Sequence, residues 1–165
     1  MKIALIILFS TFLVAADDSA LGSFKVKVSN IRISKKLYID SAFAKKYKKL
    51  MLEEFKKGPN FDNQFRIVRI GCGSSCTQIA VINMEKGKIY QTDLMIDGSG
   101  DWIRGDILQY MQESSLLIMS GCLQEDKTKC GHHEYSWQGD HFKAEFFRSN
   151  QSAHAPDATI STPAK

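Results

Sequence analysis

Residues 64–84, QFRIVRIGCGSSCTQIAVINM, contain two apolar runs on either side of a short loop that holds two cysteines. The runs at 64–72 and 77–84 have the length of strands and are rich in β-branched residues. Glycine and serine in the loop between them are typical of a tight turn, in which Gly71 and Gly73 can adopt a positive φ. This stretch therefore predicts a β-hairpin.

The chain on both sides of this hairpin predicts more sheet and one helix. We expect the hairpin to gain a third strand and a second meander to follow it, which gives an α+β fold with a mostly antiparallel sheet. The other predicted elements are a strand at 24–28 (FKVKV), a helix at 42–58, a turn at 85–88, strands at 88–96, 115–123, 133–137 and 141–148, a turn at 138–140, and a short helix within the ambiguous run at 102–112.

The predicted helix, AFAKKYKKLMLEEFKKG, is amphipathic. Its apolar residues recur at helical spacing, Asp40 or Ser41 can cap its start, and Gly58 followed by Pro59 ends it. The apolar stripe is expected to pack on the sheet. The other side is basic, and it is either solvated surface or a contact for an anionic surface; its central residues are Lys45, Lys46, Lys48 and Lys49.

The charge of the chain is unevenly distributed. The net charge is +4, but residues 25–57 hold eleven Lys and Arg against three acids, whereas residues 58–149 hold nine against twelve. Aromatic residues are not interleaved with the basic ones, as a nucleic-acid platform would require, so no nucleic-acid partner is expected. The acidic part of the chain could contact a cationic protein.

The start of the chain predicts export. Lys2 precedes an apolar stretch of signal-peptide length, and small residues at 14 and 16 favour cleavage before Asp17. Residues 1–16 are therefore interpreted as a signal peptide, residues 17–148 as one domain and residues 149–165 as a disordered tail. The expected location is the periplasm or the extracellular space, with no transmembrane segment after cleavage.

Four cysteines in an exported chain indicate two disulfides. The local pairing, Cys72 with Cys76 and Cys122 with Cys130, is preferred because each pair brackets a turn-like stretch. The two crossed pairings remain as alternatives. A bridge of either kind is expected to serve as a structural staple.

Two other kinds of chemistry compete with the staple. The 72–76 pair has three intervening residues, unlike the two of the usual redox couple, so thiol–disulfide exchange is the weaker interpretation. Cys122, Cys130, His132 and His133 could together bind a metal, but adjacent histidines on a strand point to opposite faces. No Gly-x-Ser-x-Gly elbow is present. An enzyme is therefore not the preferred interpretation, and no cofactor is expected.

The order of motifs also resembles a known pattern. The motifs are GPNF at 58–61, GCGSSC at 71–76, INMEKGKIY at 82–90, SSLLIMSG at 114–121 and HEYSWQGDHF at 133–142. This order resembles an uncharacterised family of small exported bacterial proteins that carry Gly-Cys-Gly-x-x-Cys after an Asn-Phe element and a late Tyr-x-Trp hairpin. The chain departs from that pattern at residues 62–65 and at Asn83. The resemblance implies a similar fold over about residues 40 to 147 and supplies no chemistry.

These observations predict an exported, non-enzymatic binding or envelope-associated protein. Its partner would be an unidentified protein or envelope component. One alternative is an inhibitor of a secreted enzyme such as a lysozyme. The acidic part of the chain would then contact the enzyme. The other alternative is a metal-binding or thiol-redox protein that uses the cysteine and histidine cluster.

Overall fold

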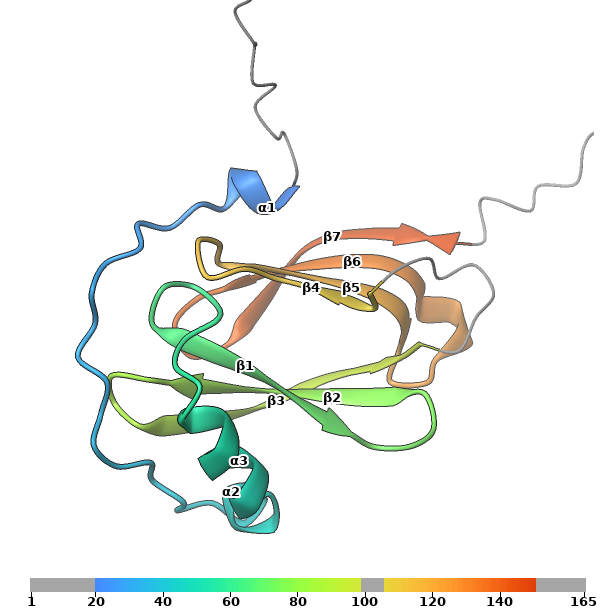
Figure 1. Ribbon diagram of the computed structural model, residues 1–165. Coiled ribbons are helices and arrows are strands. Elements are labelled where there is room, and N and C mark those ends of the chain that lie inside the picture. Colours follow the sequence, from blue (N-terminus) through green and yellow to red (C-terminus); the bar gives the residue numbers. More distant parts are fainter. Residues whose placement is uncertain (1–19, 99–105, 151–165) are drawn as a thin grey trace, which may run out of the picture.

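Two antiparallel meanders, joined at one corner, form the seven-stranded sheet of this protein (Figure 1). The computed structural model describes residues 20–98 and 106–150. The strand order is β1-β2-β3-β5-β6-β7, with β4 paired to β5. The elements are α1 (Ala20–Ser23), α2 (Ala42–Lys46), α3 (Lys48–Phe55), β1 (Phe65–Gly71), β2 (Cys76–Asn83), β3 (Lys88–Asp97), β4 (Leu108–Gln109), β5 (Leu116–Leu123), the 3-10 helix η1 (Lys127–Lys129), β6 (Cys130–Trp137) and β7 (Phe142–Ser149).

The predicted α+β class with two antiparallel meanders is therefore confirmed, and every strand predicted between residues 64 and 148 is present. The meanders meet where Ile96 and Asp97 at the end of β3 pair with β5. Further along β5, the strand β4 occupies the neighbouring position, opposite Met119 and Ile118. Because β4 takes this place, the rest of β3 diverges from β5, and the meanders lie face to face (Figure 1).

The main core fills the space between the meanders, and it is built from Phe61, Phe65, Ile67, Ile79, Val81, Leu94, Ile96, Leu108, Leu117, Met119 and Trp137. A second core lies between the first meander and the α2–α3 region, with Met51 fully buried. A third, smaller core covers the outer side of β5, where Leu21 packs against Leu116 and Ile118. Strands buried on both faces read as continuous apolar runs, which is why they were visible in the sequence.

The strand predicted at residues 24–28 is wrong. This segment makes only an isolated bridge between Lys25 and Ser114, supported by a hydrogen bond from the Val26 N–H to the Glu113 carbonyl at 2.8 Å. The Ser29 N–H then donates to the Asn63 side chain, so the segment leaves the residues that precede β5 after a few positions. From there it runs outside both meanders towards α2 (Figure 1). Local alternation favours a strand, but no strand among residues 20–98 and 106–150 accompanies this path.

Two smaller predictions also differ from the structure. Of the run at 102–112 the structure describes residues 106–112, which contain the short strand β4 and no helix, because Leu108 is drawn into the main core beside β5. Gly71 and Gly73 do not have positive φ; among the glycines that the structure describes, those that do are Gly58, Gly87, Gly121 and Gly139. The cysteine loop therefore turns without left-handed glycine. Ser149, expected to begin a tail, ends β7.

The predicted helix is present between residues 42 and 55, interrupted at Tyr47, and Gly58 follows it in the left-handed conformation. Ser41, rather than Asp40, is its N-cap: the Ser41 hydroxyl accepts the Ala44 N–H at 3.0 Å. Among residues 20–98 and 106–150, no helix is long and apolar enough to cross a bilayer. The predicted signal peptide lies outside the described residues.

The cap gives a direct stability prediction. Ser41→Ala is expected to lower the free energy of unfolding by about 1 kcal/mol, because the Ala44 N–H loses its partner. Asp40→Ala is the matched control and is expected to change it by less than about half of that. Urea denaturation of both variants measures the difference. A larger loss for Asp40→Ala would show that the cap is assigned to the wrong residue.

Asp62 gives a pH-dependent prediction. Burial raises the pKa of this carboxyl to about 6, so between about pH 4 and pH 6 the folded state holds its proton more tightly than the unfolded state. Stability is therefore expected to fall as the pH rises through this window. Asp62→Asn should remove that slope and raise the free energy of unfolding at pH 7 by about 1 kcal/mol, a figure reduced for solvent screening.

Unfolding in urea from pH 4 to pH 8 measures this dependence, with Asp106→Asn, at an exposed acid, as control. Asparagine also suits the backbone, since Asp62 has a φ of 42°. An unchanged slope in Asp62→Asn would contradict the assignment of the slope to this carboxyl.

Candidate functional site

A bulge in β3 marks the place where the two meanders separate. Gln78 lies opposite Met95 and Ala80 lies opposite Gln91, so residues 92–94 face the single residue Ile79. The Thr92 hydroxyl closes this bulge, because it donates to the Ile79 carbonyl at 2.6 Å and accepts the Leu94 N–H at 3.3 Å. Bulges of this kind bend a strand and redirect its side chains, often beside functional sites.

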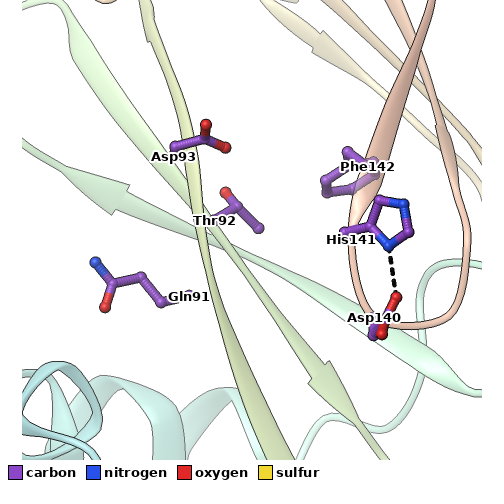
Figure 2. Close-up of a pocket in the computed structure, with 6 residues that line it drawn as sticks. All are labelled: Gln91, Thr92, Asp93, Asp140, His141 and Phe142. Carbon is purple, nitrogen blue, oxygen red and sulfur yellow. Dashed lines mark hydrogen bonds and ion pairs between the residues drawn. The ribbon is translucent and has the colours of Figure 1, made fainter.

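A cleft lies between this bulged strand and the β6–β7 hairpin. One hollow of about 430 Å³ is shown in Figure 2, with three side chains from β3 on one side and three from the hairpin on the other: Gln91, Thr92, Asp93, Asp140, His141 and Phe142. A second hollow, of about 280 Å³, shares Asp93 and Phe142 with the first. Its other lining residues are Leu94, Met95, Leu123, Gln124, Lys129, Tyr135 and Ala144. We call the two together the β3–β7 cleft.

The aromatic residues beside the cleft are continuous with the main core. Phe142 lies in both hollows and packs against the buried Trp137, with ring centroids 4.7 Å apart. Trp137 also contacts Tyr90 at 5.6 Å and Phe65 at 5.4 Å. The Trp137 indole N–H is the buried side-chain donor that has no hydrogen-bond partner among the described residues. The core therefore holds Phe142 in place from beneath.

The two ends of the cleft differ in charge. Asp140 lies in the first hollow and Asp93 lies where the two hollows meet, and the His141 Nδ1 is 2.6 Å from the Asp140 carboxylate. At the other end Lys129 forms an ion pair with Asp126 at 3.2 Å. Burial raises the pKa of Tyr135, and the negative charge of Asp93 raises it further, so the phenol remains a neutral hydrogen-bond donor at physiological pH.

Both strands that border the cleft have an open edge. Within the part of the chain that the structure describes, β3 pairs with β5 only through Ile96 and Asp97, so residues 88–94 have no strand on the side away from β2. In the same part of the chain β7 pairs with β6 alone. Open edges expose backbone donors and acceptors that another extended chain can use.

The cysteines form both local disulfides and lie outside this cleft. Cys72 is bonded to Cys76 across the turn between β1 and β2, and Cys122 to Cys130, which lies directly opposite it in the β5–β6 ladder. Each bridge therefore joins backbone segments that the sheet already places together. In this state the sulfurs are neither free thiols nor thiolate ligands.

The proposed metal cluster of Cys122, Cys130, His132 and His133 is not assembled. His132 contacts the Glu134 carboxylate at 2.8 Å, whereas His133 is buried and lies within hydrogen-bond distance of the Lys129 carbonyl at 3.0 Å. Burial lowers the pKa of His133, which is therefore a neutral core histidine. No group of three or more His, Cys, Asp or Glu side chains suited to a metal occurs among the described residues.

The basic helix face lies outside the cleft as well. Lys45, Lys46, Lys48 and Lys49 are all exposed, and the Lys46 ammonium lies 5.0 Å from the centre of the Tyr47 ring. Glu54 is a structural acid: burial tends to raise its pKa, but hydrogen bonds from Lys57 and Arg66 outweigh burial and lower it. The anionic surface expected as a contact for the basic face stays a prediction.

The sequence analysis missed the residues of the cleft. The signal that was present is the polar stretch Gln91, Thr92 and Asp93 inside an otherwise strand-like run, since three consecutive polar residues do not fit a strand with one buried face. The contribution of the hairpin could not be found in this way, because residues 140–142 lie close to β3 only through the tertiary fold. Comparison of the chain with known protein families, curated proteins and solved structures finds no match.

Proposed function

We propose that this protein is an exported, non-enzymatic binding protein of the bacterial envelope or the extracellular space, and that the β3–β7 cleft is its contact surface. The observation that carries the proposal is the cleft itself, because it combines a partly buried aromatic residue packed against the main core, Phe142, with polar groups from two separate elements. Concave sites with an apolar lining and a few convergent polar groups are the usual binding sites of proteins.

The two disulfides support the location. Bridges of this kind persist in oxidising compartments, which agrees with the signal peptide expected at residues 1–16. The lining of the cleft supports binding rather than nucleophilic chemistry, since the Thr92 hydroxyl proton is already donated to the Ile79 carbonyl. The Asp140–His141 pair is solvent-exposed, with side chains 70% and 67% accessible, so no low-dielectric surroundings activate it.

Site-specific photo-crosslinking in the producing cells tests this proposal. His141, on the lining of the cleft, is replaced by benzoylphenylalanine, and Glu53, exposed on α3, is the matched control position. We expect a discrete adduct from position 141, recovered in the exported fraction, and none from position 53. Equal adducts from both positions, or protein found only in the cytoplasmic fraction, would contradict the proposal.

Inhibition of a secreted enzyme such as a lysozyme is a more specific form of this function. Asp140 is exposed at the tip of the β6–β7 hairpin, where a carboxylate can reach a cationic surface. A lysis assay with a lysozyme tests this form: inhibition that is weakened in Asp140→Asn supports it, and unchanged lysis in the presence of the protein contradicts it.

A further inference from the structure

We infer that the β3–β7 cleft takes an extended segment of a partner protein that carries basic residues, and that this segment adds as a strand to the open edge of β3. The inference rests on the proposed function and names the occupant of the same site. Strand addition uses backbone hydrogen bonds for affinity and the alternating side chains for specificity. The open edge of β3 beside the cleft offers the first contribution, and the lining of the cleft offers the second.

The backbone contribution comes from the regular part of β3. Residues 88–91 pair with β2 in unbroken register, from Asn83 opposite Lys88 to Ala80 opposite Gln91. The other edge of these residues has no neighbouring strand within residues 20–98 and 106–150. A straight, paired strand with a free edge is the template on which a further extended chain forms hydrogen bonds.

The bulge determines where this pairing ends. Bulges and inward-facing charges are also devices that protect an edge from unspecific association. Here the bulge is closed within the protein by the Thr92 hydroxyl, and it begins only after Gln91. The pairing therefore has a defined length of about four residues, after which the partner chain meets the Asp93 side chain.

The side-chain contribution comes from the lining. Apolar and aromatic residues of the second hollow offer contact to the uncharged side chains of an extended segment; they are Leu94, Met95, Leu123, Tyr135, Phe142 and Ala144. Since successive side chains of a strand point to opposite faces, a segment in which apolar and basic residues alternate presents its apolar side chains to this surface and its basic side chains towards solvent, where the exposed carboxylates of Asp93 and Asp140 can reach them. Such a segment can bury apolar side chains and still carry charge.

Two acids of the cleft lining select basic partners. Asp93 lines both hollows, and Asp140 lies across from it on the hairpin. No hydrogen bond or ion pair of the described residues involves the Asp93 carboxylate, whereas the Asp126 carboxylate near the other end is paired with Lys129. The chain as a whole has a net charge of +4, so its overall electrostatic field repels a basic peptide. Binding of a basic segment must therefore depend on these local acids.

The test measures binding of a defined peptide to the full, oxidised chain. The probe is a fluorescently labelled octapeptide of alternating valine and lysine, blocked at both ends, followed by fluorescence anisotropy. One comparison peptide carries glutamate in place of lysine, and another carries N-methyl groups on alternate backbone nitrogens, which removes the donors of one edge. Asp93→Asn is the variant, and Glu53→Gln on the exposed side of α3 is its matched control.

We expect saturable binding of the lysine peptide, with at least tenfold weaker binding of both comparison peptides. Asp93→Asn should weaken binding of the lysine peptide about tenfold, and Glu53→Gln should leave it unchanged. Equal binding of the N-methylated peptide, or equal loss in both variants, would overturn strand addition at this edge.

A neutral chitin tetrasaccharide forms the last arm of the experiment. If it binds in the cleft and the lysine peptide does not bind at millimolar concentration, the occupant is a glycan and the inference is wrong. In that case an adduct from position 141 in cells would still support the binding function. Failure of the inference and failure of the proposed function are therefore distinguishable.

Discussion

Replacing Trp137 by alanine is expected to lower the free energy of unfolding by about 3–5 kcal/mol, the typical loss for removing a large aromatic side chain from a core. Trp137 is 4% exposed and contacts rings from three other parts of the chain, namely Phe65, Tyr90 and Phe142. It therefore joins the inner faces of both meanders. Alanine would leave a cavity there that close-packed neighbours can fill only in part.

The matched variant for this prediction is Trp137→Phe. Phenylalanine keeps a ring in the core and removes the indole N–H, which has no hydrogen-bond partner among the described residues. Removing an unpaired buried donor offsets part of the lost contact area, so we expect a loss below about 1.5 kcal/mol. Urea denaturation monitored by far-UV circular dichroism measures both variants. A loss below about 1 kcal/mol for Trp137→Ala would show that the meanders do not pack through this residue.

Trp137 also connects the core to the cleft. Phe142 lies against Trp137 on one side and lines both hollows of the cleft on the other. Loss of the indole would therefore allow Phe142 to move inward and change the shape of the cleft. For this reason Trp137→Ala is a test of the fold and not a test of binding, and the binding test uses Asp93.

Replacing Gly131 by alanine is expected to cost about 3 kcal/mol, a value at the upper end for steric overpacking. A Cβ atom at this position would lie 2.1 Å from the carbonyl oxygen of Arg148 and 2.9 Å from the ring of Phe147. The oxygen belongs to the backbone of β7, which is held to β6 by their ladder, so it cannot move without disturbing the pairing. In Gly131→Ala, the hydrogen bonds between β6 and β7 near Gly131 and Ser149 should be the first to open.

Gly71→Ala is the matched control for this glycine. A Cβ atom at Gly71 meets no other atom within 4 Å, and the residue lacks positive φ, so alanine should change the free energy of unfolding by less than about half a kcal/mol. Hydrogen exchange of the β7 amides, together with urea denaturation, measures the difference between the two variants. Equal stability of Gly131→Ala and Gly71→Ala would contradict the close approach of β6 and β7.

Local patterns were sufficient for most of the fold. The runs that became β1, β2 and β5 are long and apolar because both of their faces are buried, and such runs are visible without knowledge of the partner strands. The helix was recognisable from its apolar spacing and from the Ser41 start. The two disulfides followed from local spacing, since each joins residues on either side of one turn.

The candidate site shows where such patterns are insufficient. Asp93 and Asp140 are 47 positions apart in the chain, and they line the same hollow only because the first meander folds over the second. The failed strand at residues 24–28 has the same origin: strand formation needs a neighbouring strand, and the path of this segment provides only a bridge at Lys25. The strand propensity of residues 24–28 is a property of that segment alone, whereas strand pairing depends on two segments.

The sequence by itself determined the class of fold, the order of the strands along the chain, the helix and the two local bridges. Each of these depends on the pattern of burial within one segment or on a short separation between two residues. Only the tertiary structure decided which edges of β3 and β7 remain open and which side chains line the cleft between them. These features arise where β4 displaces β3 from β5, a competition between strands that no single segment encodes.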